Sequence, residues 1–401
     1  MTNHASLSAD WKDITELSVY GFGRVGQGTI DLFVDKFNVK YIIDNNAKYR
    51  GQYYRNIPIV DFDFYKKSDY KGKIVILAGG LATESISKTL SENEFVQGRD
   101  FCDVNQFCQD WFWEFHGQAC VARINSLITT RCTLNCEKCC LLIPYHKRPL
   151  DFNMEQLKID ADLFFQSVDY VSNFAVLGGE PLLSESLVPY LEYLGSNYKT
   201  RIGSIQVITN GTLLPSRELL EVIKTHNVEV RISDYTSQVQ YKERLDQLLQ
   251  ILKRENVKYT VFQQTEWWDI GFPETKVNMG ETKEELRQHM LGCQPFCQEI
   301  FEGKLYYCNF AWSAQQCGLF QLAEGDSLDL NSLKDDPLRK KKLLDFYFGN
   351  LENGYMSFCK VCRGFGANNK YWVPGGVQKE RHYHIKEPRE ACVSEEGDIG
   401  E

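Results

Sequence analysis

Two series of short apolar segments alternate with amphipathic segments along most of this chain. In the first series, the pattern predicts strands at 16–20, 39–43 and 73–77, one helix that follows Gly26 and runs to about residue 37, and another helix at 83–90. In the second, it predicts strands at 124–129, 173–177, 204–208, 228–232 and 257–262, with helices at 154–165, 187–194, 217–226 and 242–252. Such alternation favours parallel sheets, open or partly closed into a barrel, with ligands at the carboxyl ends of the strands. The predicted fold class is therefore α/β.

The same pattern suggests domain boundaries. We expect an N-terminal domain of the nucleotide-binding type over 1–117 and a partial (β/α) barrel over 118–285. A cysteine-bearing region without this alternation follows over 286–375. Residues 376–401 mix charges with little periodicity and are expected to form a surface tail.

Composition narrows the class of partner. The 401 residues include 45 Lys and Arg against 54 Asp and Glu, a net charge of −9 without a long basic tract, which argues against nucleic acid. No apolar run approaches the ~18 residues that span a bilayer, and no signal-peptide pattern begins the sequence. We expect a soluble cytoplasmic protein with no membrane partner. In a reducing compartment the 14 cysteines are more often metal ligands or catalytic groups than disulfides.

A glycine motif follows the first predicted strand. Gly21, Gly23 and Gly26 form a Gly-x-Gly-x-x-Gly turn into a helix, and Asp44 ends the second strand. This order is close to the dinucleotide-binding fingerprint and predicts a nucleotide-type ligand. The alternative is a vestigial or docking domain, in which the glycines serve only a tight turn and close packing. The segment resembles Rossmann-like domains attached to enzymes of sugar and cell-surface glycan metabolism.

Three cysteines follow the first strand of the second series. Cys132, Cys136 and Cys139 are separated by polar residues, which favours a loop at a strand end over a buried helix face. Three thiolates can hold three irons of a cubane cluster and leave the fourth iron open to a substrate or cofactor. Zinc is an alternative, but a structural zinc site needs four ligands. Cys140 could supply the fourth, although two adjacent residues such as Cys139 and Cys140 rarely bind one metal ion.

A second motif, Gly178-Gly179-Glu180-Pro181, ends the next strand. Its glycines expose backbone carbonyls and Glu180 adds a charge-assisted acceptor, although Gly and Pro also mark plain turns. Together with the cysteine motif it resembles the radical S-adenosylmethionine superfamily. That resemblance implies that the three cysteines hold a four-iron cluster whose open iron chelates S-adenosylmethionine, and that the Gly-Gly-Glu-Pro segment meets the methionyl ammonium.

Polar residues at two further strand ends fit the same plan. The expected cofactor contacts are Thr209, Asn210 and Ser233, for which a turn and a helix cap are the alternatives. Many members of the superfamily have an aromatic residue at the position of Lys138, so no adenine contact is expected there. The resemblance also implies an electron donor such as flavodoxin or ferredoxin.

The C-terminal region contains a second set of cysteines. Cys297 and Cys308 flank a predicted hairpin with a two-residue turn at 302–303, which places them opposite one another. Opposed Cβ atoms lie ~4.5–5.5 Å apart, a spacing that suits two ligands of one cluster, and Cys359 and Cys362 can complete four. A four-cysteine zinc site has the same count of ligands.

With the upstream motifs present, this region resembles the auxiliary-cluster domains of the SPASM and twitch branch. The spacing of that branch also fits Cys293, which competes with Cys297, but the hairpin register favours Cys297. The resemblance implies one auxiliary 4Fe-4S cluster, and hence two clusters in the chain. The remaining cysteines are expected to be ordinary thiols: Cys102, Cys108, Cys120, Cys140, Cys317 and Cys392.

These features indicate a radical S-adenosylmethionine enzyme with oxidoreductase, epimerase or related carbon-radical chemistry. The N-terminal domain favours a small-molecule substrate, a sugar or nucleotide-sugar-like metabolite. A ribosomal peptide is the alternative substrate. A non-catalytic protein that is stabilised by metal or senses redox state is an alternative of another class, although such a protein needs no open iron and no ammonium pocket.

Overall fold

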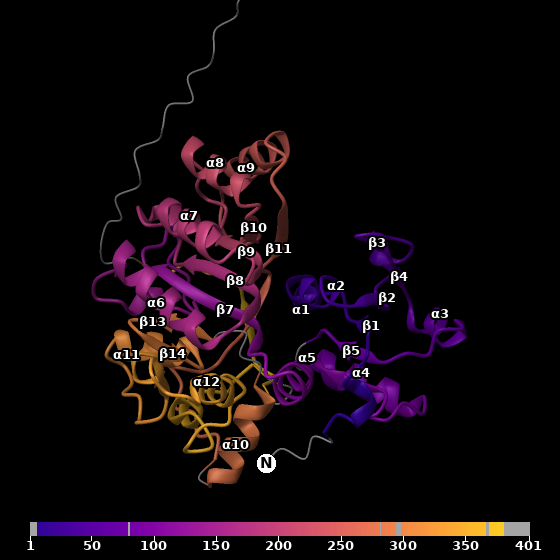
Figure 1. The fold of residues 1–401 in the computed structure, drawn as a ribbon. Helices are drawn as coiled ribbons and strands as arrows, with labels where there is room; N and C mark the ends of the chain where they lie inside the picture. Colours follow the sequence, from indigo (N-terminus) through magenta and orange to yellow (C-terminus); the bar gives the residue numbers. More distant parts are fainter. Residues whose placement is uncertain (1–5, 79–80, 281, 294–297, 366–368, 381–401) are drawn as a thin grey trace, which may run out of the picture.

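The computed structural model describes residues 6–78, 81–280, 282–293, 298–365 and 369–380. Its secondary structure is mixed α/β with parallel sheets, which confirms the predicted fold class. In Figure 1 the N-terminal unit, coloured indigo, stands beside a larger unit built on β7 to β11. Within the described ranges, every helix is too short or too polar to cross a lipid bilayer.

The N-terminal sheet has the strand order β3-β4-β2-β1-β5-β6, parallel except for the β3–β4 pair. Its strands are β1 (Glu16–Tyr20), β2 (Asn38–Ile43), β3 (Tyr53–Tyr54), β4 (Ile57–Val60), β5 (Ile74–Ile76) and β6 (Phe101–Asp103). Its helices are α1 (Arg24–Thr29), α2 (Asp31–Val34), α3 (Phe62–Lys67), α4 (Leu81–Glu92) and α5 (Val104–Phe107), followed by a π-helix at Cys108–Phe115. The single helix expected between Gly26 and about residue 37 is instead two short helices, the first of which begins at Arg24. Glycine and β-branched residues near position 29 form helix poorly.

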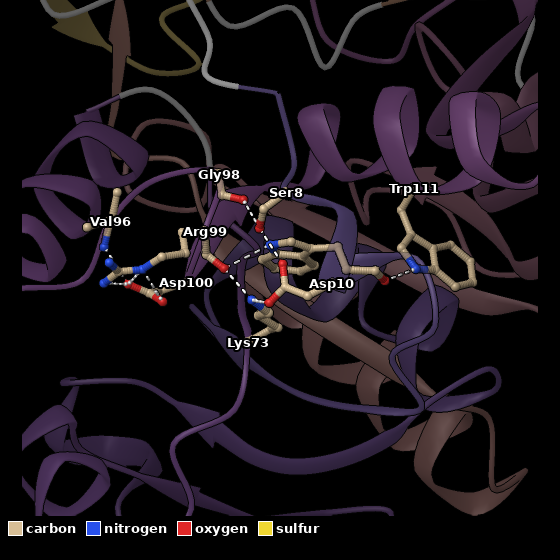
Figure 2. A network of polar contacts seen from close by, with 9 residues as sticks. Ser8, Asp10, Lys73, Val96, Gly98, Arg99, Asp100 and Trp111 are labelled. Atoms are coloured by element: carbon tan, nitrogen blue, oxygen red, sulfur yellow. Dashed lines mark hydrogen bonds and ion pairs between the residues drawn. The ribbon is translucent and has the colours of Figure 1, made fainter.

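Polar contacts fix the start of the chain to this unit (Figure 2). Trp11 Nε1 donates to the carbonyl of Arg99 at 3.0 Å, and Trp111 Nε1 donates to the carbonyl of Trp11 at 2.8 Å. Lys73 pairs with Asp10 and also donates to the carbonyl of Arg99. These bonds connect residues 8–11 to the β5–β6 side of the sheet. The short 3₁₀ helix at Ala9–Trp11 therefore belongs to the folded unit.

The second sheet has the order β11-β10-β9-β8-β7-β13-β14-β15. Its parallel strands are β7 (Cys120–Thr129), β8 (Tyr170–Gly178), β9 (Ile202–Thr209), β10 (Glu229–Asp234), β11 (Tyr259–Gln263) and β13 (Glu299–Phe301). The helices between the first five are α6 (Met154–Ser167), α7 (Leu187–Asn197), α8 (Arg217–Thr225) and α9 (Lys242–Arg254). All five strands and four helices predicted for this series are found. Their apolar faces form the main core of the molecule.

The C-terminal region adds to the edge of this sheet. It contains α10 (Lys283–Gly292), β14 (Lys304–Tyr306), α11 (Asn309–Gln316), β15 (Ser327–Asp329) and α12 (Arg339–Tyr347). β13 and β14 form the predicted hairpin, with Phe301 opposite Lys304. Its turn residues Glu302 and Gly303 have φ of 46° and 73°, as a type I′ turn requires. The predicted two-residue turn and register are confirmed.

The end of the described chain lies across the cysteine loop. β16 (Trp372–Pro374) pairs with β12 (Glu266–Trp268), and the backbone N–H of Glu137 then donates to the carbonyl of Val377 at 2.8 Å. Residues 376–380 are therefore not the surface tail that charge pattern predicted, because the loop and this segment exchange hydrogen bonds. Residues 381–401 lie outside the described ranges.

The two units share a contact at the foot of the barrel. Helix α1 packs against β7 and β8, and the buried hydroxyl of Ser172 donates to the carbonyl of Thr29 at 3.2 Å. Cys120 and Ala122, in the first half of β7, belong to the apolar core of the N-terminal unit. The first halves of β7 and β8 thus pack against the N-terminal unit.

Candidate cofactor and substrate site

A cavity of about 510 Å³ opens at the carboxyl ends of β7 to β10 and extends into the sheet interior. Eight of the residues that the sequence singled out line it: Cys132, Cys136, Cys139, Gly178, Gly179, Thr209, Asn210 and Ser233. They come from the ends of four different strands, which parallel pairing brings to one edge. The cysteine motif and the glycine motif therefore share one site.

The three cysteines lie on the loop that follows β7. Cys132 and Cys136 are 7% and 6% exposed, and Cys139 is partly buried. Burial raises the pKa of the Cys132 thiol well above its usual value, and the Glu180 carboxylate adds to the rise. A bound metal centre would lower this pKa again, because its positive charge favours the thiolate.

The described residues contain no group of three or more His, Cys, Asp or Glu side chains that closes on a single metal ion. A cubane cluster does not require such a group, since each thiolate binds a different iron and the sulfurs stand apart. Three thiols around one cavity therefore fit a cluster better than they fit a single zinc ion.

The two glycines permit a close approach of backbone to backbone. A Cβ at Gly178 would lie 2.6 Å from the carbonyl oxygen of Thr129, and a Cβ at Gly179 would lie 2.3 Å from that of Arg131. The N–H of Gly179 donates to the Thr129 carbonyl at 2.9 Å. These contacts hold the end of β8 against the chain that leads into the cysteine loop, so the glycines shape the site directly.

Glu180 and Pro181 do not line the cavity. The Glu180 carboxylate is fully buried and accepts from the Thr209 hydroxyl at 2.9 Å and from the Asn210 N–H at 2.8 Å. Burial raises its pKa to about 7. In this structure the oxygens of this side chain join the ends of β8 and β9, and its contact with a ligand ammonium stays a prediction.

Two side-chain amides approach the cysteine sulfurs. Asn210 Nδ2 lies 3.5 Å from Cys132 Sγ, and Gln378 Nε2 donates to Cys136 Sγ at 3.2 Å. Gln378 also accepts from the backbone N–H of Asn135 at 2.7 Å through Oε1. Donors to sulfur suit thiolates that carry negative charge. Sequence reading missed Gln378, since it lies far along the chain in an apparent tail.

Lys138 links the loop to the C-terminal region. Its ammonium lies 3.2 Å from Asp269 Oδ1 and 2.8 Å from Glu274 Oε2. Asp269 in turn pairs with Arg363 at 3.0 Å. Arg363 directly follows Cys362 in the sequence. Lys138 thus bridges the two cysteine regions, which is consistent with a role other than adenine contact.

The second set of cysteines gathers beside α10. The backbone N–H of Phe365 donates to Cys293 Sγ at 3.3 Å, and the N–H of Gly364 donates to Cys362 Sγ at the same distance. Burial raises the pKa of Cys362 to about 12, and the neighbouring Cys293 contributes. Burial likewise raises the pKa of Cys359, with Cys293 and Cys362 as its neighbours.

Cys308 directly follows Tyr307, which lies near this second set of cysteines. Burial raises the pKa of Tyr307, with further contributions from the charges of Cys293, Cys359 and Cys308. The expected ligand Cys297 lies outside the described residues, although the hairpin register on which it was based is confirmed. Among the described cysteines, the structure brings together Cys293, Cys359 and Cys362, and Cys308 follows Tyr307, on which Cys293 and Cys359 also act.

The remaining thiols differ in their surroundings. Cys102, Cys108 and Cys120 are buried in the N-terminal core, and Cys317 is buried in the main core. Cys140 is exposed and lines the cavity beside Cys139, which sequence reading did not foresee. Cys392 lies outside the described residues.

The glycine motif of the N-terminal unit is separate from this cavity. A Cβ at Gly26 would lie 2.0 Å from the carbonyl oxygen of Gly21, which itself has a φ of 111°, whereas a Cβ at Gly23 would meet nothing within 4 Å. Asp44 accepts from the backbone N–H of Phe22 at 2.6 Å and from that of Asn46 at 2.8 Å. Gly21, Gly26 and Asp44 thus shape the turn itself, and Gly23 leaves open space above it.

Solved structures similar to this chain include three radical S-adenosylmethionine enzymes. BtrN in complex with AdoMet and 2-DOIA has 16% identity and a TM-score of 0.28, over 35% of this chain and 56% of that chain. Native anSMEcpe with bound AdoMet and Cp18Cys peptide has 12% identity and a TM-score of 0.36, over 62% and 89%. Streptococcus suis SuiB bound to precursor peptide SuiA has 13% identity and a TM-score of 0.30, over 56% and 44%.

This chain thus spans little more than half the length of BtrN and less than half that of SuiB. With TM-scores below 0.5, these likenesses assign no substrate or reaction to it. The sequence matches no family model and no curated protein at a significant level.

Proposed function

We propose that this chain is a radical S-adenosylmethionine enzyme with a small-molecule substrate. One observation carries the proposal: three cysteines after β7 and two glycines after β8 line a single cavity together with Asn210 and Ser233. A structural metal site needs neither an open coordination position nor a cavity beside it. The arrangement suits a cluster that presents one iron to a bound cofactor.

The chain's residues would hold and orient the two groups. Cys132, Cys136 and Cys139 would ligate the cluster, and the backbone at Gly178 and Gly179 would face the cofactor from the end of the neighbouring strand β8. When bound, the cluster and S-adenosylmethionine supply a 5′-deoxyadenosyl radical that abstracts a hydrogen atom from the substrate.

Other residues shape the space around that chemistry. Thr209 and Asn210 are held in place by the buried Glu180 carboxylate, so the polar wall of the cavity is fixed in advance. Trp267 and Trp372, from paired strands β12 and β16, also line the cavity. Aromatic walls exclude water, which protects a reactive carbon radical from side reactions.

We further propose that the second cysteine group holds an auxiliary 4Fe-4S cluster. Its support is the proximity of Cys293, Cys359 and Cys362, the position of Cys308 beside Tyr307, and two backbone N–H groups that donate to Cys293 and Cys362. This cluster would accept or relay an electron. A flavodoxin or ferredoxin donor and a cytoplasmic location follow from the same proposal.

The substrate is proposed to be a sugar or nucleotide-sugar-like metabolite, and the glycine motif to bind a nucleotide-type ligand. The open space at Gly23 supports the second point. A ribosomal peptide would instead need an entry path for an extended chain. Incubation of the enzyme with candidate substrates of both kinds, followed by mass analysis, separates these possibilities.

The enzyme class is tested by anaerobic reconstitution. Metal analysis should give about eight irons per chain and negligible zinc. Addition of S-adenosylmethionine and dithionite should yield 5′-deoxyadenosine, measured by chromatography and mass spectrometry. Two zinc ions per chain with no iron and no 5′-deoxyadenosine would instead show a zinc-stabilised protein.

A further inference from the structure

The strands of the larger sheet place polar side chains in layers within its interior. Parallel pairing puts Arg123 of β7 beside Asn173 of β8, and Asn125 beside Ala175. Because paired residues of parallel strands project from the same face, positions two apart form successive layers. Arg123 and Asn125 line the cavity at its lower end, below the cysteine loop.

Arg123 is oriented by amide groups. Its Nε donates to Asn125 Oδ1 at 3.1 Å, and its Nη1 donates to Asn173 Oδ1 at 2.7 Å and reaches Gln206 Oε1 at 3.5 Å. These contacts span three neighbouring strands and set the direction of the guanidinium group. A partly buried charged group that is held in one direction is well suited to a ligand of opposite charge.

A second guanidinium lines the same cavity. Arg231 of β10 is only 4% exposed, and its guanidinium lies 4.8 Å from the centre of the Phe262 ring. The fully buried Glu299, which pairs with Asn125 across β13 and β7, has its pKa raised to about 8 by burial. Burial therefore favours the neutral form of this carboxyl at pH 7.

One polar atom in the wall awaits a partner. Asn309 lines the cavity, is 5% exposed, and its Oδ1 has no hydrogen-bond partner among the described residues. Thr29 of the N-terminal unit also lines the cavity at the foot of the barrel. The lower end is thus a polar chamber whose wall includes a residue from the neighbouring unit.

We propose that this chamber binds an anionic group of the substrate, a carboxylate or a phosphate, through Arg123 and Arg231, with Asn309 bonded to a neighbouring polar group of the same molecule. The inference rests on the proposed function only in taking the cofactor to occupy the upper end of the cavity. The substrate is accordingly an anionic small molecule whose reacting carbon lies toward the cysteine loop.

The test measures anion binding to the reconstituted protein by calorimetry, with inorganic pyrophosphate and malonate as separate probes. The tested variants are Arg231→Gln and Arg123→Gln, and the control is Arg217→Gln, whose side chain is 94% exposed on α8. A hydrogen bond to a charged group contributes about 1.5–3 kcal/mol, so each variant should weaken binding by roughly 10- to 100-fold. The control should match the parent. Stronger binding of pyrophosphate would identify a phosphate, and stronger binding of malonate a carboxylate.

Failure of both probes to bind, or equal binding by Arg231→Gln and Arg217→Gln, would overturn the inference. Circular dichroism on each variant separates loss of the site from loss of the fold, and Arg231→Gln decides if Arg123→Gln does not fold. Formation of 5′-deoxyadenosine is measured in parallel, without substrate. If it is absent from the parent while pyrophosphate binding still depends on Arg231, the anion site stands and the proposed enzyme class falls.

Discussion

Gln378 Nε2 donates a hydrogen bond to Cys136 Sγ at 3.2 Å, across 242 residues of sequence. The same amide accepts from the backbone N–H of Asn135, so both of its polar atoms are used on the cysteine loop. The Lys379 and Glu380 carbonyls accept from Asn135 Nδ2 at 2.9 and 3.0 Å. The segment that follows β16 is therefore part of the candidate cluster site.

This contact predicts an effect on the cluster's reduction potential. Reduction adds negative charge, which an N–H···S bond stabilises, so Gln378→Leu should lower the midpoint potential of the cluster at Cys136. A hydrogen bond of about 1 kcal/mol corresponds to a shift on the order of 40 mV for one electron. A redox titration followed by electron paramagnetic resonance measures it. Gln288→Leu, on the exposed face of α10, is the control and should leave the potential unchanged.

The three cysteines of the first loop should be required for cofactor cleavage but not for all of the iron. Changing Cys132, Cys136 and Cys139 together to Ala should abolish 5′-deoxyadenosine formation and leave about four irons, because the second group of cysteines is separate. Iron analysis and product detection on the same sample check both points. Continued cleavage by the triple variant would show that the site is misassigned.

Single substitutions distinguish Cys293 from Cys297 as the ligand of the auxiliary cluster. The described contacts of Cys293 with the Cys359 and Cys362 region favour Cys293, whereas the hairpin register predicted Cys297. We expect Cys293→Ala to lose up to about four irons after anaerobic reconstitution, since a cubane with a missing thiolate becomes labile. If Cys297→Ala loses them instead, the sequence-based choice was right.

Glu299 should make stability fall as pH rises. Its carboxyl has an ordinary pKa of 4.5 and a folded value of about 8. Between these values the folded protein keeps a proton that the unfolded chain has lost, so the free energy of unfolding decreases through this window. Glu299→Gln should flatten that decrease, by at most about 5 kcal/mol. Thermal unfolding at pH 5, 7 and 8.5 tests this, with exposed Glu324→Gln as the control.

Substitutions at two glycines of the N-terminal motif distinguish a role in folding from a role in ligand binding. Gly26→Ala should destabilise the protein, because its Cβ would lie 2.0 Å from the Gly21 carbonyl oxygen. Gly23→Ala should fold normally, since its Cβ has open space. If the proposed nucleotide-type ligand occupies that space, Gly23→Ala should weaken binding of ADP measured by calorimetry. Unchanged binding, or none in the parent, would favour a docking domain.

Local sequence determined much of this protein. Strand and helix periodicity, the order of the cysteine and glycine motifs, and the turn at Glu302-Gly303 depend on backbone preferences within a few residues, and the structure has these elements where the pattern placed them. Parallel pairing then brings the strand ends to one edge, so the pattern also predicted that Cys132 and Gly178 would meet.

Tertiary structure alone decided the rest. Nothing near Gln378 in the sequence marks it as a partner of Cys136, and the inward direction of Arg231 depends on which face of its strand is buried. Glu180 could face a ligand or its own sheet, and the proximity of Thr209 and Asn210 turns it to the sheet. Such choices depend on contacts between segments far apart along the chain, whose energies are set by packing and burial, and spacing in the sequence carries no record of them.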